Sequence, residues 1–202
     1  MFIQVIQGTT HQPEALHERL MVWERDLMPR AIGYLGSTGG CTEAGDCILI
    51  ARFSNAEAAR RNSERPEQSA WWAATVVLFD GPVTFHDSTD VQVMSHGDMD
   101  SAHFVQVMDG HVADRSRADA FTAETDPMLA KARPDLLGSL TAYYDADGFT
   151  EVAYFSSEDD ARVAEKQEMP SDLAERFAEY QTLWRVDRYL DLTEPWLTSA
   201  RT

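Results

Sequence analysis

Phe2-Ile-Gln-Val-Ile-Gln-Gly8 lies at the start of the sequence, and a similar stretch, Phe104-Val-Gln-Val-Met-Asp-Gly110, follows 102 residues later. Each stretch is short, mostly apolar and ended by glycine, which is typical of a β-strand. Similarity at a fixed spacing indicates copies of one structural unit. A chain of 202 residues is long enough for two domains of about 100 residues each.

Two further blocks keep the same spacing. Leu35-Gly-Ser37 returns as Leu137-Gly-Ser139, and the run Ile50–Arg60 returns as Val152–Arg162. We therefore predict two tandem domains, residues 1–97 and 98–202, that are copies of one another.

Apolar spacing and turn residues predict the order strand, helix, strand, strand, helix, strand in each copy. Pro13 suits the first turn of a helix, and Leu16, Leu20, Trp23 and Leu27 follow at helical spacing. The fold class expected is therefore α+β, with a ferredoxin-like βαββαβ domain present twice. In the first copy we expect strands at 2–7, 34–40, 47–53 and 82–94, and a second helical region over 56–79, interrupted at Pro66.

A ferredoxin-like sheet has helices on one face only, so its other face needs a partner. The first strand has apolar residues on both faces, as a sheet buried on both sides requires. We predict that the two copies pack sheet to sheet as an intrachain dimeric α+β barrel.

The charge of the chain excludes some classes of partner. Thirty-four acidic and 17 basic residues give a formal net charge of -17. Nucleic-acid binding relies on Lys and Arg, and anionic membranes attract the same residues, so neither partner is expected. No run of apolar residues is long enough to span a membrane, and no secretory signal is recognisable. These features and the presence of only two cysteines predict a cytoplasmic protein.

Three segments give the sequence a resemblance to a known family. They are the Phe-x-Gln-Val strand, the run Ala51–Arg60, and Arg65–Trp72 followed by Pro82-Val-Thr-Phe85. With these segments the chain resembles the dimeric α+β barrel superfamily, particularly antibiotic biosynthesis monooxygenase-like (ABM-like) domains. Such proteins are typically small homodimers, so the tandem chain looks like a fused dimer. The resemblance implies a monomeric pseudo-dimer, with a homodimer of the whole chain as the alternative.

Members of this superfamily include cofactor-free oxygenases of polycyclic aromatic or quinol substrates, haem-degrading enzymes, and proteins without known activity. The haem-degrading members have an Asn late in the first strand, where this chain has Gln7 and Asp109. They also have a Trp and then a His in the second helix; here Trp71 and Trp72 are present, but that His is not. The resemblance therefore favours cofactor-free chemistry, and no cofactor is expected.

Three residues are candidates for catalysis. His86 has a side chain that can move protons near neutral pH, although a lone histidine in a strand is often structural. Arg52 shares a strand face with isoleucines and therefore requires an anionic ligand or an ordinary ion pair. Trp71 lies one position off the face formed by Trp72, Val76 and Phe79, so it is expected outside the core, at a pocket wall or between the copies.

A second group of residues is predicted to line a substrate pocket. Gln4 and Gln106 hold the same position in the two copies, where each amide either binds neighbouring backbone or lines a polar pocket. The resemblance adds Asn62 and Trp72 as cavity residues, although Trp72 also suits the core. Tyr154 is the counterpart of Arg52 and completes the group.

The remaining titratable residues show no metal-binding pattern. Cys41 and Cys47 flank a hairpin turn at a spacing that suits neither zinc nor a thioredoxin motif, and their counterparts are the aromatic Tyr143 and Phe149. Packing is therefore the role expected of the cysteines. The histidines share no ligand spacing with a carboxylate or thiol cluster, so no metal is expected.

Two functions of different class follow from these observations. The first is a cofactor-independent monooxygenase that acts on a small aromatic or quinol-type substrate. The second is a non-catalytic small-molecule-binding or stress-response protein. A small apolar or aromatic ligand is the partner expected in both cases.

Overall fold

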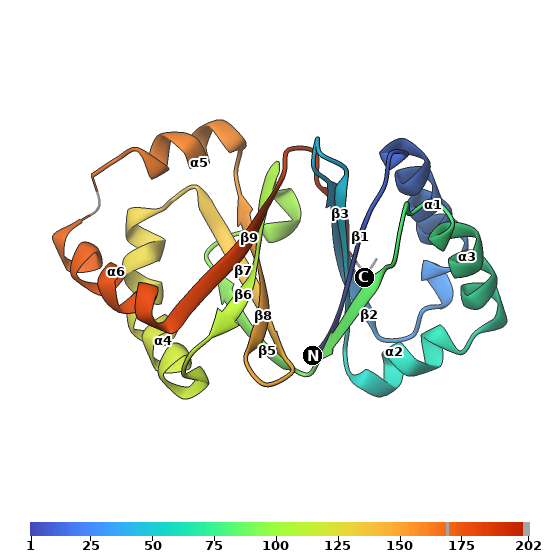
Figure 1. The fold of residues 1–202 in the computed structure, drawn as a ribbon, viewed down its shortest axis with the longest axis horizontal. Coiled ribbons are helices and arrows are strands. Elements are labelled where there is room, and N and C mark those ends of the chain that lie inside the picture. Colours follow the sequence, from blue (N-terminus) through green and yellow to red (C-terminus); the bar gives the residue numbers. More distant parts are fainter. Residues whose placement is uncertain (169, 200–202) are drawn as a thin grey trace. The chain divides into compact units, whose positions relative to one another are not determined.

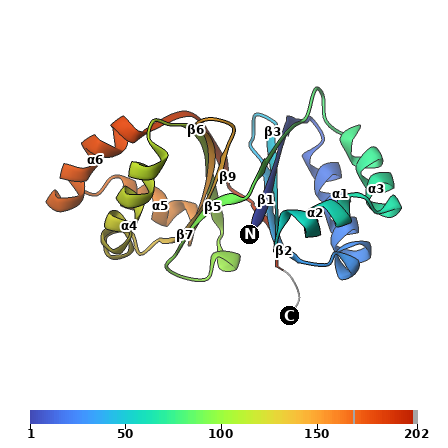
Figure 2. The same ribbon diagram turned by 90° about the horizontal axis from the view of Figure 1, so that it is seen from below.

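The computed structural model describes residues 1–168 and 170–199 and divides the chain into two compact units. The first unit is Met1–Val91 together with the segment that follows Thr193, and the second is Gln92–Thr193. Each unit contains an antiparallel five-stranded sheet. In each unit the helices cover one face of its own sheet (Figures 1 and 2). The α+β class and the duplicated domain predicted from the sequence are confirmed.

The first unit has the sheet order β10-β2-β3-β1-β4. Pro13 occupies the first turn of α1, as predicted, and Pro66 begins α3 after an interruption of the helical region. The strands are β1 (Phe2–Thr9), β2 (Tyr34–Cys41), β3 (Asp46–Phe53), β4 (Thr84–Ser88) and β10 (Trp196–Ser199). The helices are α1 (Pro13–Asp26), the 3-10 turn η1 (Met28–Arg30), α2 (Ala56–Ser63) and α3 (Pro66–Val76).

The second unit repeats this plan with the order β5-β7-β8-β6-β9. The side chains of Asn55 and Ser157, 102 residues apart, accept hydrogen bonds from the first turns of α2 and α5. The strands are β5 (Asp90–Ser95), β6 (Phe104–Val112), β7 (Leu136–Tyr144), β8 (Gly148–Phe155) and β9 (Trp184–Leu192). The helices are η2 (Met99–Ser101), α4 (Arg115–Ala132), α5 (Glu158–Glu165) and α6 (Ser171–Leu183).

The end of each copy differs from the sequence prediction. The single closing strand expected at 82–94 is two strands: β4 pairs with β1 of the first unit, whereas β5 lies beside β7 of the second. Reciprocally, β10 follows the second unit in sequence and pairs with β2 of the first. The units are therefore not the contiguous segments 1–97 and 98–202. The physical reason is that a sheet edge offers unpaired N–H and C=O groups, which a strand from either copy satisfies equally well.

Strand register determines which side chains face the helices. Gln4 of β1 lies near Trp23 of α1, so its neighbours Ile3 and Val5 point to the opposite face of the sheet. In the second unit Gln106 of β6 faces α4 and α6 in the same way, and Val105 points away from them. This alternation decides which of the predicted site residues can meet.

Candidate ligand-binding site

The second unit has a cavity of about 550 Å³, partly open to solvent, between its sheet and the helices α4, α5 and α6. This volume lies in the usual range for small-molecule sites. The lining is mainly apolar and aromatic and includes Met108, Phe121, Leu129, Phe155, Phe177 and Tyr180. A side chamber of about 80 Å³ shares Phe121 and Tyr180 with the cavity and adds Tyr143 and Trp184.

The first unit has a much smaller cavity at the equivalent place, of about 90 Å³. Trp23 of α1 fills the space: its ring centroid lies 4.9 Å from that of Tyr34 and 6.5 Å from that of Trp71. The residue 102 positions after Trp23 is Thr125 of α4, which lines the large cavity. Replacement of an indole by a threonine side chain therefore contributes to the difference in volume.

Glu151 lies in the middle of β8 and lines both the large cavity and its side chamber. It pairs with Met108 of β6 and with Thr141 of β7. Removal from water raises the pKa of the Glu151 carboxyl, and a hydrogen bond with the Ser139 hydroxyl opposes part of that rise. The cavity thus contains a carboxylate whose charged form is destabilised by its surroundings.

Two phenols accompany this carboxylate. Burial raises the pKa of Tyr143 to about 12. Burial also raises the pKa of Tyr180, and the negative charge of Glu151 adds to the rise. Tyr180 stacks between Phe177 and Trp184, with ring centroids 6.0 Å and 5.0 Å away. Both phenols therefore stay protonated at neutral pH and can donate hydrogen bonds.

The arginines that line the cavity are already paired with carboxylates. Arg133 donates to Asp135 at 2.7 Å, and Arg162 contacts Asp191 and Glu165. Gln106 donates its amide N–H to the same Asp191, at 2.8 Å. Because these positive charges are neutralised, the lining suits an uncharged aromatic ligand better than an anion.

Of the predicted pocket residues, Gln106 lines the large cavity, and Gln4 and Asn62 line the small one. Gln4 and Gln106 also make equivalent contacts in the two units. Gln4 donates a hydrogen bond to Asp87 at 2.9 Å, and Gln106 donates one to Asp191. Trp72 packs at the side of the first core, with its ring 5.5 Å from that of Phe85.

Three predicted residues lie on the other face of their sheets. Arg52 pairs with Ile3 and His86 with Val5, so both point away from the helices of the first unit. Tyr154 pairs with Val105 and is only 2% exposed, on the corresponding face of the second sheet. The structure therefore does not bring Arg52 and His86 together with Trp71, which lies on the helix-covered side.

Trp71 lines the small cavity of the first unit, one of the two places predicted for it, but it is buried and not exposed as expected. It is 8% exposed, belongs to the core cluster with Trp23 and Tyr34, and donates its indole N–H to the backbone oxygen of Arg19 at 2.8 Å. Trp72 is the less buried of the two tryptophans. The side chains that α3 buries are Trp71 and Thr75, four residues apart, whereas Trp72 lies beside that face with its ring 6.4 Å from that of Phe79.

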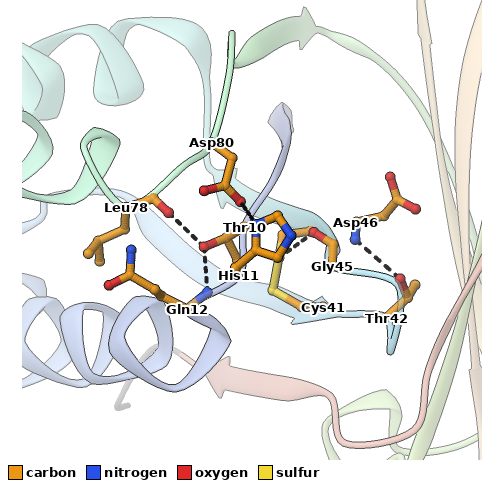
Figure 3. The surroundings of a disulfide bond; sticks show 10 residues. Thr10, His11, Gln12, Cys41, Thr42, Gly45, Asp46, Leu78 and Asp80 are labelled. Atoms are coloured by element: carbon orange, nitrogen blue, oxygen red, sulfur yellow. Dashed lines mark hydrogen bonds and ion pairs between the residues drawn. A yellow bond between two sulfur atoms is a disulfide. The ribbon is translucent and has the colours of Figure 1, made fainter.

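The cysteines are another correction, since Cys41 and Cys47 form a disulfide instead of packing as free thiols. They are cross-strand partners in the β2–β3 hairpin, which places their side chains next to each other. Figure 3 shows the surroundings of the disulfide. The Thr10 hydroxyl donates a hydrogen bond to the Leu78 backbone oxygen at 2.6 Å, and the His11 ring is hydrogen-bonded to the Asp80 carboxylate. Since disulfides are typical of oxidising compartments, the cysteines no longer support a cytoplasmic location.

No motif or spacing in the sequence indicated Glu151, because one glutamate within an otherwise apolar strand also fits a solvent-facing position. Comparison of the two copies gives one indication, since the residue of the first copy that corresponds to Glu151 is the apolar Leu49. No group of His, Cys, Asp and Glu in residues 1–168 and 170–199 is arranged to hold a metal ion. Among the helices within those ranges, none is long and apolar enough to cross a membrane.

Comparison with solved structures identifies the fold. A candidate monooxygenase from Lactobacillus acidophilus aligns over 98% of this chain and 96% of its own, with a TM-score of 0.66 and 14% identity. A second candidate monooxygenase, from Fusobacterium nucleatum, aligns over 99% of this chain and 92% of its own, with a TM-score of 0.70 and 9% identity. An anthrone oxidase-like protein aligns over 98% and 90%, with a TM-score of 0.68 and 8% identity.

These likenesses extend over both units, and at such low identities they establish the fold alone. The tandem α+β arrangement predicted from the sequence is thereby confirmed. No protein-family profile and no curated protein sequence matches the chain.

Proposed function

We propose that the protein is a cofactor-independent monooxygenase whose substrate, a small uncharged aromatic or quinol-type molecule, binds in the cavity of the second unit. The observation that supports this proposal is the cavity itself: about 550 Å³, with a mainly apolar surface beside polar groups and arginines that are paired with carboxylates. The monooxygenase and anthrone oxidase descriptions of the structural neighbours suggest the type of reaction.

An anthrone-type substrate makes the electron balance explicit. Its ring CH₂ group is oxidised by four electrons to a carbonyl, and O₂ is reduced by the same four electrons. One oxygen atom enters the product and the other leaves as water. The electrons come from the substrate, so the overall reaction needs no external reductant.

Oxygen consumption tests this function. Purified protein with anthrone or a naphthoquinol is expected to consume one O₂ for each quinone formed from anthrone, at a rate above that of buffer. Oxygen electrode traces and product absorbance provide the two measurements. Binding of anthrone without oxygen consumption would instead support the non-catalytic binding protein, and absence of binding would refute both functions for this ligand class.

A further inference from the structure

We infer that Glu151 is the group that accepts a proton from the ligand in the second cavity, and that the ligand is therefore a carbon acid or a phenol. This inference rests on the proposed function, because it assigns a role within the same cavity. It names a residue outside the group predicted from the sequence.

The position of Glu151 is the first argument. It lies between Met108 and Thr141 on the helix-facing side of the sheet, where the large cavity and the side chamber meet. A ligand that occupies either space therefore comes close to this carboxylate. A general base must lie within hydrogen-bond reach of the proton that it removes.

The other titratable groups of the lining are less suited to this role. Glu165 is already engaged in an ion pair with Arg162, at 3.2 Å, so its carboxylate oxygens are not directed at a ligand alone. Tyr180 is a protonated phenol at neutral pH and so is a donor of hydrogen bonds, not a base. Glu151 instead shares a hydrogen bond with Ser139, a neutral hydroxyl.

The surroundings of Glu151 also raise its basicity. Exclusion of water destabilises the charged carboxylate, so its pKa lies above the ordinary value for glutamate. A base whose pKa lies nearer the working pH accepts a proton more readily from a weak acid. The same apolar surroundings hold a flat aromatic ligand.

The proton-transfer step can be written in full. The C–H or O–H bond of the ligand breaks, its proton forms an O–H bond with Glu151, and its electron pair stays on the ligand as an enolate or phenolate. The phenol of Tyr180 lines the same cavity and can donate a hydrogen bond to that anion. This step transfers a proton only and requires no oxidant.

Hydrogen–deuterium exchange without oxygen isolates this step. Anthrone is incubated anaerobically with the protein in D₂O, and loss of its ring CH₂ signal is followed by proton NMR. Wild-type protein is expected to accelerate the exchange above the buffer rate. Glu151→Gln is expected to lower that acceleration by about 100-fold, a typical effect of losing a general base.

Two controls accompany the variant. Glu175→Gln makes the same chemical change at an exposed position of α6 in the same unit, so it is expected to exchange like the wild type. Quenching of tryptophan fluorescence by anthrone, together with circular dichroism, shows whether each variant is folded and still binds the ligand.

Each outcome has a distinct meaning. Exchange that depends on Glu151 without oxygen consumption supports the inference and refutes the proposed monooxygenase function. Exchange that is as fast in Glu151→Gln as in the wild type overturns the inference and leaves that function standing. Binding of anthrone with no acceleration of exchange by the wild type also overturns it. Failure of anthrone to bind refutes the ligand class and therefore both proposals.

Discussion

Glu151 of β8 holds the position in the second sheet that Leu49 of β3 holds in the first. Glu151 pairs with Met108 across β6, and Leu49 pairs with Ile6 across β1, at a constant offset of 102 residues. Leu49 belongs to an apolar cluster and lines the small cavity of the first unit, whereas Glu151 lines the large cavity of the second. This difference between the two copies thus gives the second cavity a titratable group at a position that is apolar in the first.

The stability of the chain is expected to depend on the ionisation of Glu151. Its pKa is higher in the folded state than in the unfolded state, so the free energy of unfolding falls as pH rises from the ordinary glutamate pKa through the folded-state value. Glu151→Leu removes this dependence and is expected to raise the unfolding free energy at pH 8 by on the order of 1 kcal/mol. Urea titrations at pH 4 and pH 8 measure the effect.

Glu175→Leu is the matched control for this measurement, because Glu175 is exposed on α6. It is expected to change stability equally at both pH values. A gain for Glu151→Leu that is as large at pH 4 as at pH 8 would contradict a raised pKa.

Filling the large cavity should abolish ligand binding. Thr125→Trp introduces the residue found at the equivalent position of the first copy, where Trp23 packs against Tyr34 and Trp71. We expect at least a tenfold loss of affinity for anthrone, equivalent to about 1.4 kcal/mol, measured by fluorescence titration. Thr125→Val, which replaces the hydroxyl bonded to the Phe121 backbone oxygen by a methyl group at nearly constant volume, is the control and should retain binding. Equal affinities of the two variants would place the ligand elsewhere.

Trp71 is expected to matter for stability. Trp71→Ala removes a buried indole and its hydrogen bond to Arg19, and should lower the unfolding free energy by about 3–5 kcal/mol. Because Trp71 belongs to the first unit, oxygen consumption per folded molecule should stay within twofold of the wild type. Loss of turnover in folded Trp71→Ala protein would support the catalytic role predicted from the sequence.

The disulfide between Cys41 and Cys47 closes a short loop and should contribute about 2 kcal/mol to stability. Reduction, or the double replacement Cys41→Ser and Cys47→Ser, is expected to lower the denaturation midpoint. Comparison of urea curves with and without reductant measures this. Trapping of free thiols in intact cells then tests the predicted cytoplasmic location, where the two cysteines should be reduced.

The predicted elements came from local patterns, and most were observed. Leu16, Leu20 and Trp23 lie at helical spacing, and α1 forms there with Pro13 in its first turn. The matching stretches that begin at Phe2 and Phe104 both form strands, β1 and β6. Each pairs with the second strand of the hairpin that follows it in the sequence. Spacing along the chain suffices for such features, since helix and strand periodicity repeat within a few residues.

The site depended on contacts between distant residues, which a linear pattern does not contain. Helical spacing predicts Trp71 off the buried face of its helix, whereas α3 buries Trp71 because it packs against Trp23 of α1. Arg52 and His86 were grouped with Trp71, and only the strand register showed that they lie across the sheet from it. The pairing of Cys41 with Cys47 likewise follows from the hairpin register.

The sequence by itself determined that the chain is a tandem α+β protein, because a repeat of 102 residues preserves the same order of strand and helix signals in both copies. Only the tertiary structure decided that β5 and β10 complete the sheets as they do, since edge strands are chosen by hydrogen bonding and not by composition. It also decided that the small side chain of Thr125 leaves a cavity open in the second unit, whereas Trp23 fills the equivalent space in the first. Glu151 lines the open cavity of the second unit. Volume and desolvation depend on every neighbour at once, and the fold alone brings those neighbours together.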